Sequence, residues 1–148
     1  MNSEKLTILL VEDDPNDVML LERAFKKANI MNPIQVVDNG EDAQAYLLGA
    51  DKFSDRKKYP MPEVILLDLK LPRKSGLEVL AWLKHQPNLK RIPVIVLTSS
   101  AEKRDINRAY ELGVNSYLTK PVEFEDLLEM VKNIKGYWLE MNNRPELD

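Results

Sequence analysis

The nine residues from Val64 to Pro72 read VILLDLKLP. Four aliphatic residues are followed directly by a single acid, Asp68. An unbroken apolar run of this kind is typical of a parallel strand that is covered on both faces. A carboxylate at the end of such a strand is costly to bury unless it finds a partner or gives up its charge. We therefore expect Asp68 to have a chemical role and the rest of the sequence to supply its partners.

Similar runs recur along the chain and predict the fold. The other apolar runs are LTILLV at 6–11, IQVV at 34–37, PVIVL at 93–97 and a weaker SYL at 116–118. The intervening segments contain helix start and stop signals, namely Asp14 before Pro15, Asn39, Ser75 with Glu78, Ser99 with Glu102, and Gly113. Five strands that alternate with five helices predict an α/β protein with a doubly wound parallel sheet.

The composition is that of an ordinary globular domain. The chain has 148 residues, of which 44% are hydrophobic and 30% charged, and its formal net charge is −3. This length fits one domain, and the small negative charge gives no general attraction for nucleic acid or anionic membranes. The chain has no cysteine, which excludes disulfides and thiolate metal sites. The first apolar run is too short to span a bilayer and no cleavage site follows it, so we expect a cytoplasmic protein.

Polar side chains follow these runs at the points where the expected strands end. Glu12 and Asp13 follow the first strand, Asp68 the third, Thr98 the fourth and Lys120 the fifth. Because parallel strands end at the same edge of a sheet, we expect these groups to converge. Acids about 5 Å apart repel by roughly 3 kcal/mol per pair at an effective dielectric of 20. Such a cluster needs a cation, a lysine or protons, and oxygen ligands without imidazole or thiolate favour Mg²⁺.

At these positions the chain resembles the receiver domains of two-component response regulators. The resemblance covers nearly the whole sequence and rests on four motifs in order, LLVEDDP, VILLDLKLP followed by SGLEVL, VIVLTSS and YLTKP. It implies a flavodoxin-like three-layer sandwich with strand order 2-1-3-4-5. It also implies a phosphorelay protein, not a conventional enzyme, that takes a phosphoryl group from a histidine kinase. Such a protein catalyses only its own phosphorylation and dephosphorylation and signals by protein–protein contact.

The resemblance assigns the chemistry to particular residues. It makes Asp68 the phosphorylated carboxylate and Lys120 the ammonium group that pairs with the phosphoryl oxygens. It makes Asp13 and Asp68 ligands of Mg²⁺, with Glu12 binding directly or through water. The backbone carbonyl of Lys70 is a further ligand. Mg²⁺ and the lysine neutralise the negative charge that builds up when a carboxylate attacks a phosphohistidine.

The resemblance also implies a conformational switch. Thr98 would donate its hydroxyl to a phosphoryl oxygen and move toward it, and Tyr117 would rotate into the space that is vacated. The altered face is expected on the fourth helix, the fifth strand and the fifth helix. The Lys120–Pro121 peptide bond is expected to be cis.

Two other functions use similar residues. A haloacid-dehalogenase-like phosphatase also combines a strand-end aspartate, a hydroxyl residue, a lysine and Mg²⁺. Such enzymes normally have a second acid two residues after the nucleophile, where this chain has Lys70. A receiver-fold scaffold that is never phosphorylated has no need of acids that repel one another. Simpler structural roles are also open: Glu12 and Asp13 can serve a helix N-terminus, and Tyr117 can be a core residue.

The C-terminal segment and one long loop are the candidate contact surfaces. Few residues follow Lys120, so we expect one receiver domain over 4–142, with 134–148 as an extended last helix or tail, and no output domain. Apolar residues at three- and four-residue spacing predict a homodimer through the last helix, and packing of Trp138 on its own domain is the alternative. The interface candidates are Phe124, Val131, Tyr137, Trp138 and Met141.

The segment 49–63 is expected to be a surface loop, and its length also makes it a candidate for partner recognition. This loop and the aromatic tail are similar to those of small regulators that are paired with phytochrome-type histidine kinases in photosynthetic bacteria. The resemblance therefore implies a sensor histidine kinase as a partner, and the similarity of the loop and tail indicates the phytochrome class. The other expected partners are a second copy of the chain and a downstream protein that the sequence does not identify.

Overall fold

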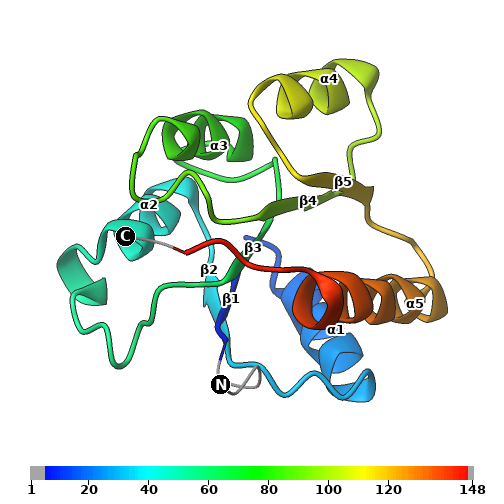
Figure 1. The fold of residues 1–148 in the computed structure, drawn as a ribbon. Coiled ribbons are helices and arrows are strands. Elements are labelled where there is room, and N and C mark those ends of the chain that lie inside the picture. The colour runs from blue at the N-terminus through cyan, green and yellow to red at the C-terminus, as the bar shows by residue number, and fades with distance from the viewer. Residues whose placement is uncertain (1–5, 147–148) are drawn as a thin grey trace.

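A five-stranded parallel sheet forms the centre of the computed structural model, which describes residues 6–146 (Figure 1). The strands are β1 (Ile8–Val11), β2 (Ile34–Val37), β3 (Val64–Leu67), β4 (Val94–Thr98) and β5 (Ser116–Thr119). Their order in the sheet is β2-β1-β3-β4-β5, with every neighbouring pair parallel. The predicted fold class and strand order are confirmed.

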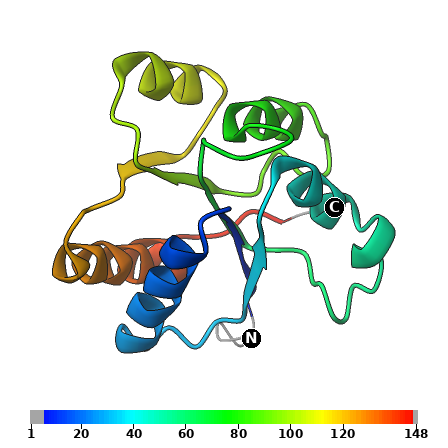
Figure 2. The same cartoon turned by 180° about the vertical axis from the view of Figure 1, so that it is seen from behind.

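Helices cover both faces of this sheet, which gives the predicted three layers. On one face α1 (Pro15–Lys27) packs beside α5 (Phe124–Ile134), as both views show (Figures 1 and 2). The other face is covered by α2 (Gly40–Leu48), α3 (Gly76–Lys84) and α4 (Lys103–Glu111). Successive strand residues enter opposite cores, since Leu10 packs with the α1 and α5 side and Leu9 with the other.

The three central strands explain the unbroken apolar runs. Every residue of β1, β3 and β4 is buried, whereas the edge strands β2 and β5 are partly exposed. The register pairs Val11 of β1 with Leu67 of β3. The residues that come next, Glu12 and Asp68, therefore leave the sheet at the same level. This register places the predicted acids side by side.

Most of the predicted helix signals are confirmed. The Asp14 side chain caps α1 and accepts a hydrogen bond from the Asn16 amide at 2.9 Å. The Asn39 side chain caps α2, and Ser75 forms a reciprocal capping box with Glu78 at the start of α3. Beyond the end of α4, Gly113 has a φ of +92°, a left-handed conformation that favours glycine.

The predicted capping box between Ser99 and Glu102 is wrong. Helix α4 begins after Glu102, which caps it with no side-chain hydrogen bond. The side chain that organises this turn is Ser100, whose hydroxyl accepts from the Glu102 amide at 3.3 Å and donates to Asp105 at 2.6 Å. The helix cap lies at Glu102, three residues later than the pattern indicated, and the hydroxyl that reaches the helix start comes from Ser100.

The long loop 49–63 is held against the fold by specific contacts. It contains a short 3₁₀ helix, η2 (Asp51–Phe53), whose Phe53 ring is buried against Tyr46 and Tyr59. The Arg56 guanidinium donates to the carbonyls of Tyr46 at 2.7 Å, Leu47 at 2.8 Å and Tyr59 at 3.1 Å. Two of these carbonyls belong to the last turn of α2, so Arg56 satisfies the end of that helix. A role in partner recognition stays a prediction.

The last helix continues beyond Gly136 as a π-helical segment, η3 (Lys135–Met141). Tyr137 and Met141 are 52% and 74% exposed, whereas Trp138 packs partly against its own core. Val131 is fully buried in that core, because it faces α1 and the sheet. The prediction that Val131 lies at a dimer interface is therefore wrong.

Some of the predicted boundaries fall at the ends of the chain. The predicted domain start at residue 4 and the last two residues of the predicted tail lie outside the described residues. Between residues 6 and 146, no helix is both long enough and apolar enough to cross a membrane.

Candidate functional site

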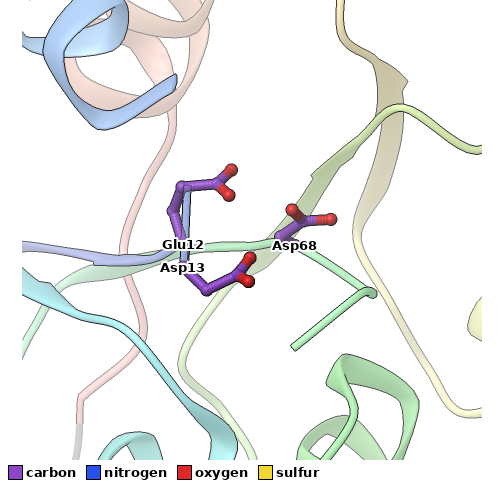
Figure 3. A group of neighbouring side chains, drawn as sticks. All are labelled: Glu12, Asp13 and Asp68. Atoms are coloured by element: carbon purple, nitrogen blue, oxygen red, sulfur yellow. The ribbon is translucent and has the colours of Figure 1, made fainter. Parts of the chain in front are cut away.

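Three carboxylates meet where β1 and β3 end. Oxygen atoms of Glu12, Asp13 and Asp68 lie within 4.8 Å of one another, and Figure 3 shows these side chains on neighbouring segments. Glu12 and Asp68 are only 2% and 6% exposed, while Asp13 is open to solvent. The structure thus brings together the three acids that the sequence placed at this edge of the sheet.

The sheet ladder and one glycine fix the two buried acids. The Asp68 amide donates to the Val11 carbonyl at 3.0 Å, and the Glu12 amide donates to the Val37 carbonyl at 3.0 Å. The start of α3 passes so close that a Cβ on Gly76 would lie 2.1 Å from the Asp68 carbonyl oxygen. Any larger residue at position 76 would displace the segment that holds Asp68.

Lys120 supplies the positive charge in this cluster. Its ammonium nitrogen forms ion pairs with Glu12, with Asp17 at 2.8 Å and with Asp68 at 3.1 Å. The lysine side chain is 13% exposed, and its backbone amide donates to the Thr98 carbonyl at 2.7 Å. One lysine is therefore shared among three acids, of which the sequence had identified two.

Asp17 is the site residue that the sequence analysis missed. It lies in the first turn of α1, where an acid is common because it stabilises the helix dipole. Its contact with Lys120 depends on the direction in which α1 leaves β1, and no local motif specifies that direction. The available signal was an acid one turn into a helix that begins at the site.

The pKa values of Glu12 and Lys120 are both raised, which favours the neutral form of the acid and the charged form of the lysine. Burial raises the pKa of Glu12 to about 7, although hydrogen bonds from Lys120 and the Asp14 amide lower it. For Lys120, burial alone lowers the pKa, but hydrogen bonds to Asp17 and Glu12 and the charge of Asp68 raise it overall. The ammonium group therefore keeps its charge, whereas the raised pKa of Glu12 favours its protonated form up to about neutral pH.

The donor set fits a hard divalent cation. Carboxylate oxygens are the ligands that Mg²⁺ prefers, and an exposed member such as Asp13 leaves room for the waters that Mg²⁺ retains. The Lys70 amide donates to Asp68 Oδ1 at 3.3 Å, so the chain after β3 folds back on the carboxylate. A cation bound to this cluster would compete with Lys120 for Glu12 and Asp68.

Thr98 and Tyr117 are linked through the connection that follows β4. Thr98 is fully buried, and its hydroxyl oxygen accepts from the Ser100 amide at 3.5 Å. The Tyr117 hydroxyl donates to the Ser100 carbonyl at 2.9 Å. Burial raises the pKa of Tyr117, which keeps this hydroxyl protonated and able to donate. The predicted rotation of Tyr117 stays a prediction.

One backbone prediction is wrong. The Lys120–Pro121 peptide bond is trans, and the described part of the chain contains no cis peptide bond. Bonds before proline prefer the trans form by about 0.5–1 kcal/mol when nothing else decides between them. Here the trans form already lets Lys120 reach all three of its acids.

Comparisons with known proteins match nearly the whole chain. The family model for the response regulator receiver domain matches residues 8–132. Response regulator Rcp1 of Synechocystis sp. is 44% identical over 138 residues, which make up 93% of this chain and 92% of the relative.

Solved structures agree with this match. The phosphorylated cyanobacterial phytochrome response regulator RcpA is 39% identical with a TM-score of 0.89, covering 96% of this chain and 99% of that one. The Mn²⁺-bound form of Rcp1 is 42% identical with a TM-score of 0.86, covering 95% of this chain and 99% of that one.

Proposed function

This chain belongs to the response regulator receiver domain family, and we propose that its Asp68 accepts a phosphoryl group from the phosphohistidine of a sensor histidine kinase. The observation that carries the proposal is the position of Asp68 beside a lysine and within an acidic cluster that suits a divalent cation. One of its oxygens lies 3.1 Å from the Lys120 ammonium, and the carboxylate also belongs to the cluster with Glu12 and Asp13. We propose Mg²⁺ as the cation of that cluster, and a relative of this chain binds Mn²⁺.

The transfer itself is a direct displacement at phosphorus. An oxygen of Asp68 attacks the phosphorus atom while the bond from phosphorus to the histidine nitrogen breaks, and the nitrogen keeps that electron pair. The Lys120 ammonium is close enough to contact the phosphoryl oxygens, and its raised pKa keeps it charged. Glu12, Asp13 and Asp68 would hold a divalent cation, which would supply further positive charge at this site. The product is an acyl phosphate, and its hydrolysis restores the carboxylate.

Asp68 is a better acceptor than the other two acids. The two oxygens of Glu12 are occupied, one by the Lys120 ammonium and the other by the Asp14 amide. Asp13 is exposed, and it is not among the three acids that pair with Lys120. A phosphoryl group on Asp68 lies beside Lys120 and within the acidic cluster at once.

Hydrolysis of external phosphate esters is not favoured. The position two residues after Asp68 holds Lys70, an exposed residue that cannot act there as the carboxyl acid and base of a phosphatase. The family match is to receiver domains along most of the chain. The proposed chemistry is limited to the protein's own phosphorylation and the hydrolysis of its acyl phosphate.

The signal would pass to the α4, β5 and α5 face through Thr98 and Tyr117. The buried Thr98 hydroxyl would move to a phosphoryl oxygen, and this movement would pull on Ser100, whose carbonyl accepts the Tyr117 hydroxyl. Release of that hydroxyl would free the tyrosine ring to turn. The switch is a two-state equilibrium that the phosphoryl group biases.

The partners proposed here follow from the relatives and from the exposed surface. Related proteins are described as phytochrome response regulators, so a phytochrome-type histidine kinase is the proposed phosphodonor. Because such a kinase needs ATP, the cytoplasm is the proposed compartment. A second copy is the proposed partner of the C-terminal face, formed by Phe124, Tyr137, Trp138 and Met141. Sedimentation at high concentration tests this dimer, and a monomer both with and without phosphorylation contradicts it.

The function is tested with acetyl phosphate as a small phosphodonor. Wild-type protein incubated with acetyl phosphate and Mg²⁺ should gain one phosphoryl group by intact mass spectrometry, and Asp68→Asn should gain none. Asp38→Asn is a matched control, because Asp38 is an exposed acid at the end of β2 outside the cluster. That variant should be phosphorylated like the wild type. Absence of label on the wild type would favour a scaffold role.

A further inference from the structure

Lys120 has one acidic partner that does not belong to the cation cluster. Of the three acids paired with it, Glu12 and Asp68 are also members of the triad that suits Mg²⁺, whereas Asp17 is not. The Asp17 carboxylate lies 2.8 Å from the ammonium nitrogen, and its side chain is 34% exposed. A cation that enters the triad therefore competes with Lys120 for two of its partners and leaves the third unaffected.

We propose that Asp17 is a positioning residue that keeps the Lys120 ammonium at the site while a divalent cation occupies the triad. The inference rests on the proposed function, because the position of Lys120 matters for phosphoryl transfer only when Asp68 is the acceptor. Asp17 acts through the lysine and does not touch the reacting atoms.

Competition between the two cations makes such a partner necessary. Glu12 pairs with Lys120 through one oxygen and binds the Asp14 amide through the other, so it has little capacity to hold a metal and the lysine together. The metal and the ammonium group also repel each other. Without Asp17, the lysine either keeps Glu12 and Asp68 and excludes the metal, or it loses both and becomes mobile.

Helix α1 gives Asp17 a fixed position. The helix begins with Pro15, and its N-cap Asp14 is bonded to the Asn16 amide at 2.9 Å. Further along, α1 packs against α5. An acid in the first turn of such a helix also stabilises the helix dipole, so a test must separate this structural effect from an effect on Lys120.

A double-mutant cycle on Mg²⁺ affinity makes that separation. Calorimetry on the wild type, Asp17→Asn, Lys120→Met and the double variant gives four dissociation constants. With Lys120 present, Asp17→Asn should weaken Mg²⁺ binding about tenfold, because the ammonium then stays on Glu12 and Asp68. In the Lys120→Met background the same change should have about a twofold effect, from long-range charge alone. Equal effects in both backgrounds overturn the proposal.

The lysine can also be observed directly by NMR of its ¹⁵N-labelled ammonium group. In Mg²⁺-saturated wild type, this group should exchange its protons with water slowly. In Mg²⁺-saturated Asp17→Asn, exchange should accelerate at least about fivefold, whereas the metal-free variant keeps slow exchange through Glu12 and Asp68. Unchanged exchange with Mg²⁺ present contradicts the proposal. Glu22→Gln, which removes an exposed acid from the same helix, should alter neither readout.

These measurements are independent of the test of function. If acetyl phosphate labels the wild type but the cycle shows no coupling, the role of Asp17 is wrong and the receiver chemistry stands. If coupling is found and the wild type is never labelled, Asp17 still positions Lys120 beside a cation and the proposed phosphoryl transfer is wrong.

Discussion

Lys120 and Arg56 are both held by several oxygen atoms, but the two sets of oxygens differ in charge. Lys120 is surrounded by three carboxylates at the carboxyl edge of the sheet. Arg56 donates to the neutral backbone carbonyls of Tyr46, Leu47 and Tyr59. Carboxylates can exchange one cation for another, whereas carbonyls at a helix end lose their donor if the arginine leaves. Under the proposed function, Lys120 serves the phosphoryl chemistry, whereas the contacts of Arg56 hold the end of α2 and the following loop.

The largest effect that this comparison predicts is on the rate of phosphorylation. Lys120→Met should slow labelling of Asp68 by acetyl phosphate about 100-fold at saturating Mg²⁺, because the charge beside the phosphoryl oxygens is lost. The rate is measured by intact mass over time. The control is Lys135→Met, since Lys135 donates to the carbonyl of Ala28 and not to the cluster. A rate within threefold of wild type for Lys120→Met would place the lysine outside the chemistry.

Replacement of the arginine should affect stability instead. Arg56→Met should lower the free energy of unfolding by about 2 kcal/mol, because carbonyls at the end of α2 lose their donors. Urea denaturation gives this value, and Lys57→Met, an exposed neighbour, should stay within about 0.5 kcal/mol of wild type. The labelling rate of folded Arg56→Met should equal that of wild type. A slower labelling rate of folded Arg56→Met would mean that Arg56 also contributes to phosphorylation.

The raised pKa of Glu12 should make Mg²⁺ binding depend on pH. Since its pKa is raised to about 7, Mg²⁺ must displace a proton below that pH. The apparent Mg²⁺ affinity measured by calorimetry should therefore rise as much as about tenfold per unit between pH 5.5 and 7, and level off above pH 8. Glu12→Gln should remove this dependence. A steep dependence that survives in Glu12→Gln would assign the proton to another group.

The same shift has a consequence for the metal-free protein. A folded-state pKa above the ordinary value of 4.5 means that the folded protein binds the proton more tightly than the unfolded chain. The stabilisation from Glu12 is thus complete below pH 4.5 and is lost as the pH rises through 7. Urea unfolding at pH 5 and pH 7.5 should show this loss in wild type and not in Glu12→Gln.

The smallest expected effect concerns Tyr117, which donates to a carbonyl as Arg56 does. Tyr117→Phe removes the hydrogen bond to Ser100 and should lower the free energy of unfolding by about 1 kcal/mol or less. Its labelling rate should be unchanged, because the hydroxyl lies outside the acidic cluster. Near-equal stability together with a rate loss of more than tenfold would mean that the tyrosine takes part in the chemistry.

The sequence predicted the parts of the site that depend on strand ends. Glu12 and Asp68 directly follow buried strands and Lys120 directly follows the partly exposed β5, and parallel pairing brings the ends of these strands to one edge of the sheet. The capping signals at Asp14 and Ser75 are equally local, because a cap acts within one helical turn. Strand ends and helix caps can be predicted because each depends on residues that are close together in the sequence.

Other features depend on how distant segments pack against one another, which no short sequence pattern specifies. The contact of Asp17 with Lys120 requires the packing direction of α1, and the carbonyl contacts of Arg56 require the course of the whole 49–63 loop. Val131 follows the same apolar spacing as the exposed Met141, and only the packing of α5 on α1 separates a core residue from a surface one. Spacing alone could not distinguish them.

The most direct test is to locate the phosphorylated residue. Sodium borohydride reduces the acyl phosphate of an aspartate to homoserine, which survives proteolysis and is mapped by peptide mass spectrometry. After treatment of the wild type with acetyl phosphate and Mg²⁺, homoserine should appear at position 68 and at no other acid. Homoserine at position 12 or 13, or its absence from every position, would show that Asp68 is not the phosphorylated residue.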